Sequence, residues 1–394
     1  MRRVPVSETC LINPRLPAAI ASQKDRDVDF VPMASLGEDG CISLNGSRKL
    51  GEVLKGYTYF ENGDVLVAKI TPCMENGKAA YVHSLKHGIA FGSTEFHVLR
   101  PNKGVEPRYL FHMVWTPYFR HEAARNMTGT AGQQRVPSNF FERFEIPLPP
   151  LPEQKRIADI LDKADAIRRK RLESIAVLEE AITSLYEEII GDPLVNPHKW
   201  EMTTLGEYVD FVAGFAFQSS RYSDRTGIRL LRGANVLPNR IDWSDTCYWP
   251  NDAAVDDRLK LVPDDVVLAM DRPWISSGIK VARVSKADLP CYLVQRVARL
   301  RSTSGISQAF IYYSLRHPAF TTHCGNRKTE TTVPHISPHD IRSFPIPTVP
   351  RTVHERFASS VGAIERGLQH VRCAEQHSVD LFNSLVQRAF CGEL

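Results

Sequence analysis

A proline-rich run at residues 146–157 reads Ile146-Pro147-Leu148-Pro149-Pro150-Leu151-Pro152-Glu153-Gln154-Lys155-Arg156-Ile157. Proline is tolerated in the first turn of a helix, and an acidic residue there faces the positive end of the helix dipole. The run therefore predicts the start of a long helix, which extends to about Ile190 and stops at Gly191-Asp192-Pro193. A second such run, at residues 344–347, predicts another long helix from about Val353 to Phe390.

The two runs belong to an internal repeat with an offset near 200 residues. Residues 63–68 match 264–269, residues 96–100 match 297–301, and Val136-Pro137 matches Val333-Pro334. Their common order indicates a duplicated domain and not a solenoid of short repeats. We predict an α+β protein with two duplicated α/β domains, at residues 1–150 and 193–350. They are separated by a central helix at residues 151–192 and a C-terminal helix at residues 351–394.

Each predicted helix carries a coiled-coil seam that two polar residues interrupt: Arg168 and Arg171 in the first, Glu375 and Ser378 in the second. Parallel pairing in register would bury all four against apolar partners, at about 1–3 kcal/mol each. Antiparallel pairing sets Arg171 on Glu375 and Arg168 near Ser378. The seams thus predict an antiparallel pair with pseudo-twofold symmetry and the domains at opposite ends. The alternative is that each helix packs on its own domain.

Composition excludes few classes of protein. Apolar residues make up 43% and charged residues 24%, as in ordinary globular proteins. A net charge of +4 permits nucleic-acid binding without arguing for it. No apolar run approaches the roughly 20 residues of a membrane span, so we expect a cytoplasmic protein without a membrane partner. The eight cysteines include no C-x-x-C pair, and no metal site is expected.

Motifs of catalytic chemistry are missing from the sequence. The Gly-Lys pair at Gly77-Lys78 lacks the rest of a phosphate-binding loop. Asn13-Pro14 and Asn196-Pro197 lack the second proline and the aromatic residue of an adenine methyltransferase motif, so we interpret both as turns. We expect no catalytic residue in this chain.

Four polar segments offer side chains that contact DNA. Arginine, glutamine and asparagine read base edges, while backbone amides and the hydroxyls of serine and threonine hold phosphates. The candidates in the first domain are Lys69, Thr71, Asn76, Thr128, Thr130, Gln133, Gln134 and Arg135. Those in the second domain are Arg272, Trp274, Ser276, Asn326, Arg327, Lys328 and Thr329. The alternative is that these segments are solvated surface loops.

The chain resembles the DNA specificity subunits of type I restriction-modification enzymes. The resemblance rests on residues 146–157, on the C-terminal residues 381–394, and on the alternation of domain and long helix. The second helix entry, at residues 349–356, departs from the pattern because it lacks the Glu-Gln pair, and the first domain has no counterpart of Trp200.

The resemblance implies a non-catalytic subunit that reads a bipartite, asymmetric site in double-stranded DNA. It also implies helices that set the spacer and dock two methyltransferase subunits and restriction/translocase subunits. S-adenosylmethionine, ATP and Mg²⁺ would bind only in those partners. Two alternatives stay open: a stand-alone DNA-modifying enzyme with an unfamiliar motif, and a scaffold in which only the helices matter.

Overall fold

The computed structural model describes residues 2–44, 46–130, 132–251, 254–303, 305–325 and 334–394. The chain divides into two compact units: unit 1 comprises Met1–Leu172 and Cys373–Leu394, and unit 2 comprises Glu173–Arg372. The long helices α7 (Leu151–Ile189) and α11 (Arg351–Cys391) each contribute to both units. The four-part division stays a prediction, because each unit combines one domain with parts of both helices.

Unit 1 contains a four-stranded antiparallel sheet whose middle strand β6 (Val65–Ala68) is buried on both faces. Side chains alternate along a strand. Val65 and Val67 therefore face a core shared with helix α4 (Pro107–Val114), and Leu66 and Ala68 face the core of a second sheet. The first sheet has the order β2 (Cys10–Ile12), β9 (Phe96–Pro101), β6 and β7 (Ala79–Tyr81). The second has the order β4 (Ser47–Lys49), β3 (Asp27–Val31), β8 (Ile89–Gly92) and β5 (Thr58–Glu61).

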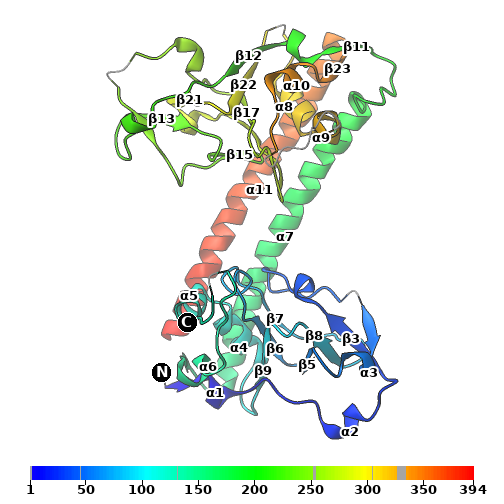
Figure 1. The fold of residues 1–394 in the computed structure, drawn as a ribbon, viewed down its shortest axis with the longest axis vertical. Helices are drawn as coiled ribbons and strands as arrows, with labels where there is room; N and C mark the ends of the chain where they lie inside the picture. The colour runs from blue at the N-terminus through cyan, green and yellow to red at the C-terminus, as the bar shows by residue number, and fades with distance from the viewer. Residues whose placement is uncertain (1, 45, 131, 252–253, 304, 326–333) are drawn as a thin grey trace. The chain divides into compact units, whose positions relative to one another are not determined.

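The same unit is completed by short elements around these sheets (Figure 1). A two-stranded pair of β1 (Arg3–Pro5) and β10 (Glu145–Pro147) brings the two ends of the domain together. The short helices are α1 (Val6–Thr9), α2 (Ala18–Ala21), α3 (Leu50–Val53), α5 (Pro117–Arg125) and α6 (Phe140–Arg143).

Unit 2 repeats this plan, with four strands in its first sheet and three in its second. Its four-stranded sheet has the order β12 (Val209–Ala213), β22 (Val297–Ser302), β17 (Val266–Ala269) and β20 (Val281–Arg283). Its second sheet holds β16 (Tyr248–Trp249), β13 (Ile228–Leu231) and β21 (Cys291–Leu293), with β13 and β21 parallel, as β3 and β8 are in unit 1. The domain ends meet in β11 (Glu201–Thr204) and β23 (Pro345–Thr348).

Unit 2 also contains two short ribbons, three short α-helices and, among its described residues, four single-turn 3-10 helices. The ribbons are β14 (Val236–Leu237) with β15 (Arg240–Ile241), and β18 (Trp274–Ile275) with β19 (Gly278–Ile279). The helices are α8 (Gln308–Arg316), α9 (Pro318–Gly325) and α10 (Pro338–Arg342). The equal strand orders of the first sheet in each unit, and the parallel pair in each second sheet, confirm the duplicated α+β fold that the repeat predicted.

A buried ion pair recurs in the two sheets. Asp64 accepts two hydrogen bonds of 2.8 Å from Arg100, and Asp265 accepts bonds of 2.7 and 2.8 Å from Arg301. The carboxylates are about 1% exposed. Burial raises the pKa of Asp64, although the Arg100 guanidinium and the Glu61 amide act against that shift.

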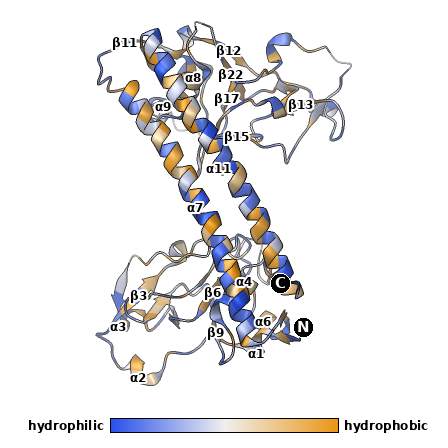
Figure 2. Ribbon diagram, turned by 180° about the vertical axis from the view of Figure 1, so that it is seen from behind, coloured by the Kyte–Doolittle hydropathy of each residue, from blue (hydrophilic) through white to orange (hydrophobic). Residues whose placement is uncertain are grey.

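The long helices run antiparallel within each unit. In unit 1, the residues that start α7 share a core with the residues that end α11: Ile157, Ala158, Leu161, Val386 and Ala389. In unit 2, Glu179 lies 2.5 Å from Arg372, while Tyr186, further along α7, packs edge-on against Phe357, which precedes Arg372 on α11. Apolar positions recur along both helices, as the colouring in Figure 2 shows. The predicted antiparallel coiled coil is confirmed.

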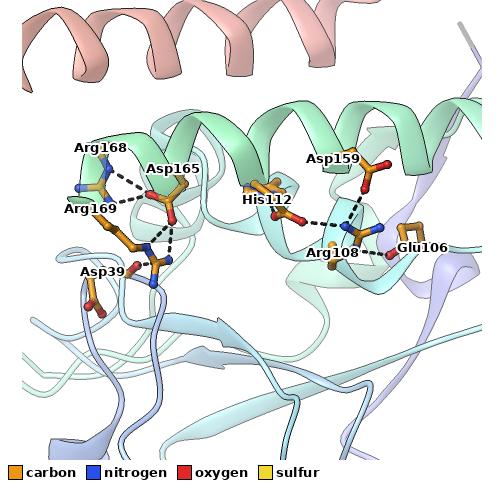
Figure 3. A network of polar contacts seen from close by, with 9 residues as sticks. Asp39, Glu106, Arg108, His112, Asp159, Asp165, Arg168 and Arg169 are labelled. Carbon is orange, nitrogen blue, oxygen red and sulfur yellow. Dashed lines mark hydrogen bonds and ion pairs between the residues drawn. The ribbon is translucent and has the colours of Figure 1, made fainter. Parts of the chain in front are cut away.

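A polar network fastens the first domain to α7 (Figure 3). Asp162 accepts from His112 at 2.7 Å and from Arg108 at 2.8 Å, and the same guanidinium reaches Asp159. One turn further on, the buried Asp165 accepts hydrogen bonds from Arg168 and Arg169. In unit 2 the Tyr313 hydroxyl, at the place of His112, donates to Glu365. The fold therefore fixes each domain to its long helix through carboxylates.

Candidate nucleic-acid interface

The two polar segments of the first domain meet at the end of strand β6. The Thr71 N–H donates to the Gln134 carbonyl at 2.9 Å, and the Gln134 N–H donates to the Thr71 hydroxyl at 3.1 Å. The Val136 N–H donates to the Lys69 carbonyl, and Thr128 pairs with Arg135 through both backbone groups. Segments some 60 residues apart in the sequence thus form one backbone-paired platform.

Arg135 is the most tightly held of the candidates on this platform. Its Nε and Nη2 donate to the two carboxylate oxygens of Glu95, each at 2.9 Å, and its Nη1 donates to the Gln133 carbonyl at 3.0 Å. The side chain is 42% exposed. The hydrogen bond from Arg135 holds the pKa of Glu95 below its usual range. Glu95, which precedes strand β9, was not among the residues predicted from the sequence.

The other candidates of this domain are half-buried or exposed. Lys69, Thr71 and Gln134 are half-buried beside the joint, while Asn76, Thr128, Thr130 and Gln133 are exposed. The Asn76 amide donates to the Glu38 carboxylate at 2.9 Å, so it lies against an acidic side chain. No group of three or more metal-ligating side chains occurs in the part of the chain that the structure describes.

The second domain presents an equivalent platform with different side chains. The Arg272 N–H donates to the Pro334 carbonyl at 2.9 Å, with Arg272 at a φ of 44°, and Asp271 pairs with His335. Trp274 Nε1 donates to the Thr321 hydroxyl at 3.1 Å, and Ser276 is exposed in the ribbon after β18. The candidates Asn326, Arg327, Lys328 and Thr329 lie outside the described residues.

The structure corrects one match of the repeat. The Ile336 N–H donates to the Met270 carbonyl, as the Val136 N–H donates to the Lys69 carbonyl. Ile336, and not Val333, is therefore the equivalent of Val136, and its offset of 200 residues agrees with the offset of 201 between Lys69 and Met270. His335 consequently stands at the place of Arg135.

A lysine next to each platform connects it to the second sheet of its domain. Lys78 and Lys280 occupy equivalent places, since their carbonyls accept from Ala68 and Ala269 at the ends of β6 and β17. Their ammonium groups donate to the carbonyls of Met33 and Gly233. Burial lowers the pKa of Lys280, and the nearby Arg272 lowers it further. These lysines tie the second sheet of each domain to the strand that carries the platform.

The polar residues of the helix seam take partners that differ in part from those predicted. Arg171 donates to the Ala374 carbonyl and the Ser378 hydroxyl, which flank Glu375 on α11. Arg168 bonds to Asp165 in its own helix and lies over the Trp115 ring. An Arg171–Glu375 ion pair is not among the contacts of the described residues. The long Arg171 side chain reaches the backbone and hydroxyl beside Glu375 instead, so Ser378 faces Arg171 and not Arg168.

Comparisons with known proteins agree on one family. A model described as the type I restriction modification DNA specificity domain matches residues 14–179. The type I restriction enzyme EcoAI specificity subunit of Escherichia coli is 29% identical, over 96% of this chain and 80% of its own length. The EcoEI specificity subunit of the same organism is 36% identical, over 52% of this chain and 35% of its own length.

Solved structures share the fold over the whole chain. A structure from work on complex assembly and conformational transition of the type I R-M system has a TM-score of 0.53 at 21% identity, covering 100% of this chain and 98% of that one. The S subunit of the type I restriction-modification system from M. genitalium has a TM-score of 0.52 at 14% identity, covering 99% and 96%. Among the described residues, no helix is long and apolar enough to cross a membrane.

Two α/β domains of similar topology, each with a backbone-paired loop platform and each packed on antiparallel long helices, define a duplicated architecture. The chain is similar to the specificity subunits of type I restriction-modification enzymes, and its residues 14–179 match the DNA specificity domain of that family.

Proposed function

We propose that this chain reads a bipartite, asymmetric site in double-stranded DNA, one half with each domain. The observation that carries the proposal is the pair of equivalent platforms. Each is built from the same backbone hydrogen bonds but presents different side chains, with Arg135 in one and His335 in the other. Two platforms with the same backbone arrangement and different side chains suit two half-sites of different sequence.

The long helices are proposed to set the spacer between the half-sites and to dock two methyltransferase subunits, to which restriction/translocase subunits add. Apolar side chains that are exposed on these helices support docking: Ile167 (48%), Leu172 (44%), Val177 (63%) and Leu381 (54%). The placement of the domains at opposite ends of the helices, with a pseudo-twofold axis between them, belongs to this proposal.

Catalysis is proposed to lie in the partners, which would bind S-adenosylmethionine, ATP and Mg²⁺. The test incubates the purified chain with DNA and labelled S-adenosylmethionine, first alone and then with the methyltransferase expected from a neighbouring gene. We expect methyl transfer at a bipartite site in the second mixture and none in the first. Transfer by the chain alone would favour the stand-alone enzyme.

A scaffold without DNA contacts is distinguished by affinity. Arg135→Ala is expected to weaken specific binding by about 1–3 kcal/mol and to relax the preference at one half-site. A scaffold would show the same affinity before and after the substitution.

A further inference from the structure

Glu95 and Arg135 form a preorganised arrangement on the first platform. A guanidinium carries five N–H donors in one plane. Glu95 takes two of them through the Nε and Nη2 side, and the Gln133 carbonyl takes a third from Nη1. Among the contacts of the described residues, one N–H remains on each terminal nitrogen of Arg135.

We propose that Arg135 reads a guanine and that Glu95 is its positioning residue, an inference that rests on the DNA-reading function proposed above. Guanine offers two neighbouring acceptors, O6 and N7, at its major-groove edge, and an arginine with two free donors binds both. A free arginine side chain samples many rotamers in solution, and part of that freedom is lost on binding. Glu95 removes that freedom before DNA arrives, so less is lost in forming the base contact.

The position of Glu95 explains why it acts on Arg135 and not on the DNA directly. The Lys69 N–H donates to the Glu95 carbonyl at 2.9 Å, so the backbone of Glu95 is fixed to the strand that carries the platform. Its side chain is 24% exposed, against 42% for Arg135. The arginine is thus the more accessible member of the pair, and the carboxylate lies behind it.

The second domain offers an internal comparison at the same place. Arg296 is the equivalent of Glu95, since its carbonyl accepts from the Met270 N–H as that of Glu95 accepts from Lys69. His335 stands at the place of Arg135, and its Nδ1 lies 2.6 Å from a carboxylate oxygen of Asp271. One ring nitrogen, Nε2, is left for a base, so a bidentate contact is impossible there. We therefore expect the chain to discriminate more strongly between bases at the position that Arg135 reads than at the position that His335 faces.

The test selects DNA from a random double-stranded library with the full chain and sequences the bound fraction. Wild type is compared with Arg135→Ala, Arg135→Lys and Glu95→Gln, and with Arg125→Ala as the control, because Arg125 is an exposed arginine paired with Glu122 on α5. At one guanine position we expect Arg135→Ala and Arg135→Lys to lower enrichment about tenfold to a hundredfold. Glu95→Gln keeps the shape but not the charge, and we expect a loss of several-fold at that position alone.

The outcomes separate this inference from the proposed function. If wild type selects a bipartite site and Arg135→Ala leaves every position unchanged, the assignment of Arg135 is wrong while the function stands. If Arg135→Ala acts but Glu95→Gln changes nothing, the positioning role is wrong. If wild type selects no sequence, the proposed function fails and this inference with it. Thermal unfolding and affinity for unselected DNA, both expected to match wild type, exclude misfolding as the cause.

Discussion

At the scale of the residue, the buried ion pairs Asp64–Arg100 and Asp265–Arg301 are the features of the repeat with the clearest energetic role. Each carboxylate lies at the start of a middle strand and would be isolated from water without its arginine. Leaving a buried charge without its partner typically costs about 3–5 kcal/mol of folding stability, far more than an exposed ion pair contributes. The retention of both pairs in diverged domains follows from this asymmetry.

We therefore expect Arg100→Leu to destabilise unit 1 by about 3–5 kcal/mol at neutral pH, as measured by urea unfolding. Burial already raises the pKa of Asp64, and removal of Arg100 raises it further above the unfolded value. The folded variant then binds a proton more tightly than the unfolded chain, so its deficit shrinks as the pH falls toward the unfolded pKa. Arg125→Leu, on the exposed face of α5, is the control. A deficit below about 1 kcal/mol for Arg100→Leu would contradict the prediction.

For Asp162 we expect the opposite dependence of folding stability on pH. Burial raises the pKa of this carboxyl, but the hydrogen bond and charge of His112, followed by those of Arg108, lower it more, and its pKa lies below the usual range. A lowered folded pKa stabilises the fold above the unfolded value, and that contribution is lost as the pH falls through the folded pKa. Asp162→Asn should cost about 1 kcal/mol at pH 7, a small value because the side chain is 39% exposed.

The measurement for Asp162→Asn is denaturant unfolding at several pH values. The wild-type and variant curves should converge as the pH falls below about 4. Asp159→Asn is the matched control, because Asp159 accepts from the same arginine but is 56% exposed. A deficit for Asp162→Asn that stays constant between pH 7 and 3 would show that its charge is not involved.

At the scale of the element, the packing of α11 against the second domain contributes more stability than the exposed positions of the two long helices. Phe357 is fully buried among Tyr186, Phe310 and Tyr313. We expect Phe357→Ala to cost about 3–5 kcal/mol in the unfolding of unit 2. Val177→Ala, at a 63% exposed site on α7 in the same unit, should stay within about 0.5 kcal/mol. Equal effects of the two substitutions would mean that α11 does not pack as described.

The elements also show what sequence alone could predict. The long helices were predicted to within two residues at their starts, because proline-rich entries and a sustained seam are local signals. The polar character of the Thr71 and Gln134 segments marked each as a candidate, but their joining was not predicted from the sequence. Glu95 and Asp271 could not be found, because each acts through a partner that only the register of distant strands brings close. The Arg171 contacts differed because seam positions give only the approximate level at which residues meet, and a long side chain can reach beyond the residue opposite it.

At the scale of the whole molecule, each domain is an insertion between two paired strands. In unit 1, Val4 pairs with Ile146, and in unit 2, Thr203 pairs with Ile346 at the equivalent register. The two ends of each domain are thus neighbours, held by the same short antiparallel ladder and followed by a long helix. Such adjacent ends permit the exchange of one domain for another without a change in the helices.

This geometry predicts the behaviour of a chain in which residues 4–146 replace residues 203–346. Both of its domains would carry Arg135 and Glu95, so we expect it to select a site with two identical half-sites, each with a guanine at the same position. Antiparallel helices would present the two copies in opposite directions, and the half-sites should therefore form an inverted repeat. Selection from a random DNA library provides the measurement, with the wild-type chain as the control that keeps its asymmetric site.

A folded exchange variant that still selects the asymmetric wild-type site would contradict the assignment of one half-site to each domain. A direct repeat would leave that assignment intact but contradict the proposed pseudo-twofold arrangement, because the orientation of the half-sites reports the orientation of the domains.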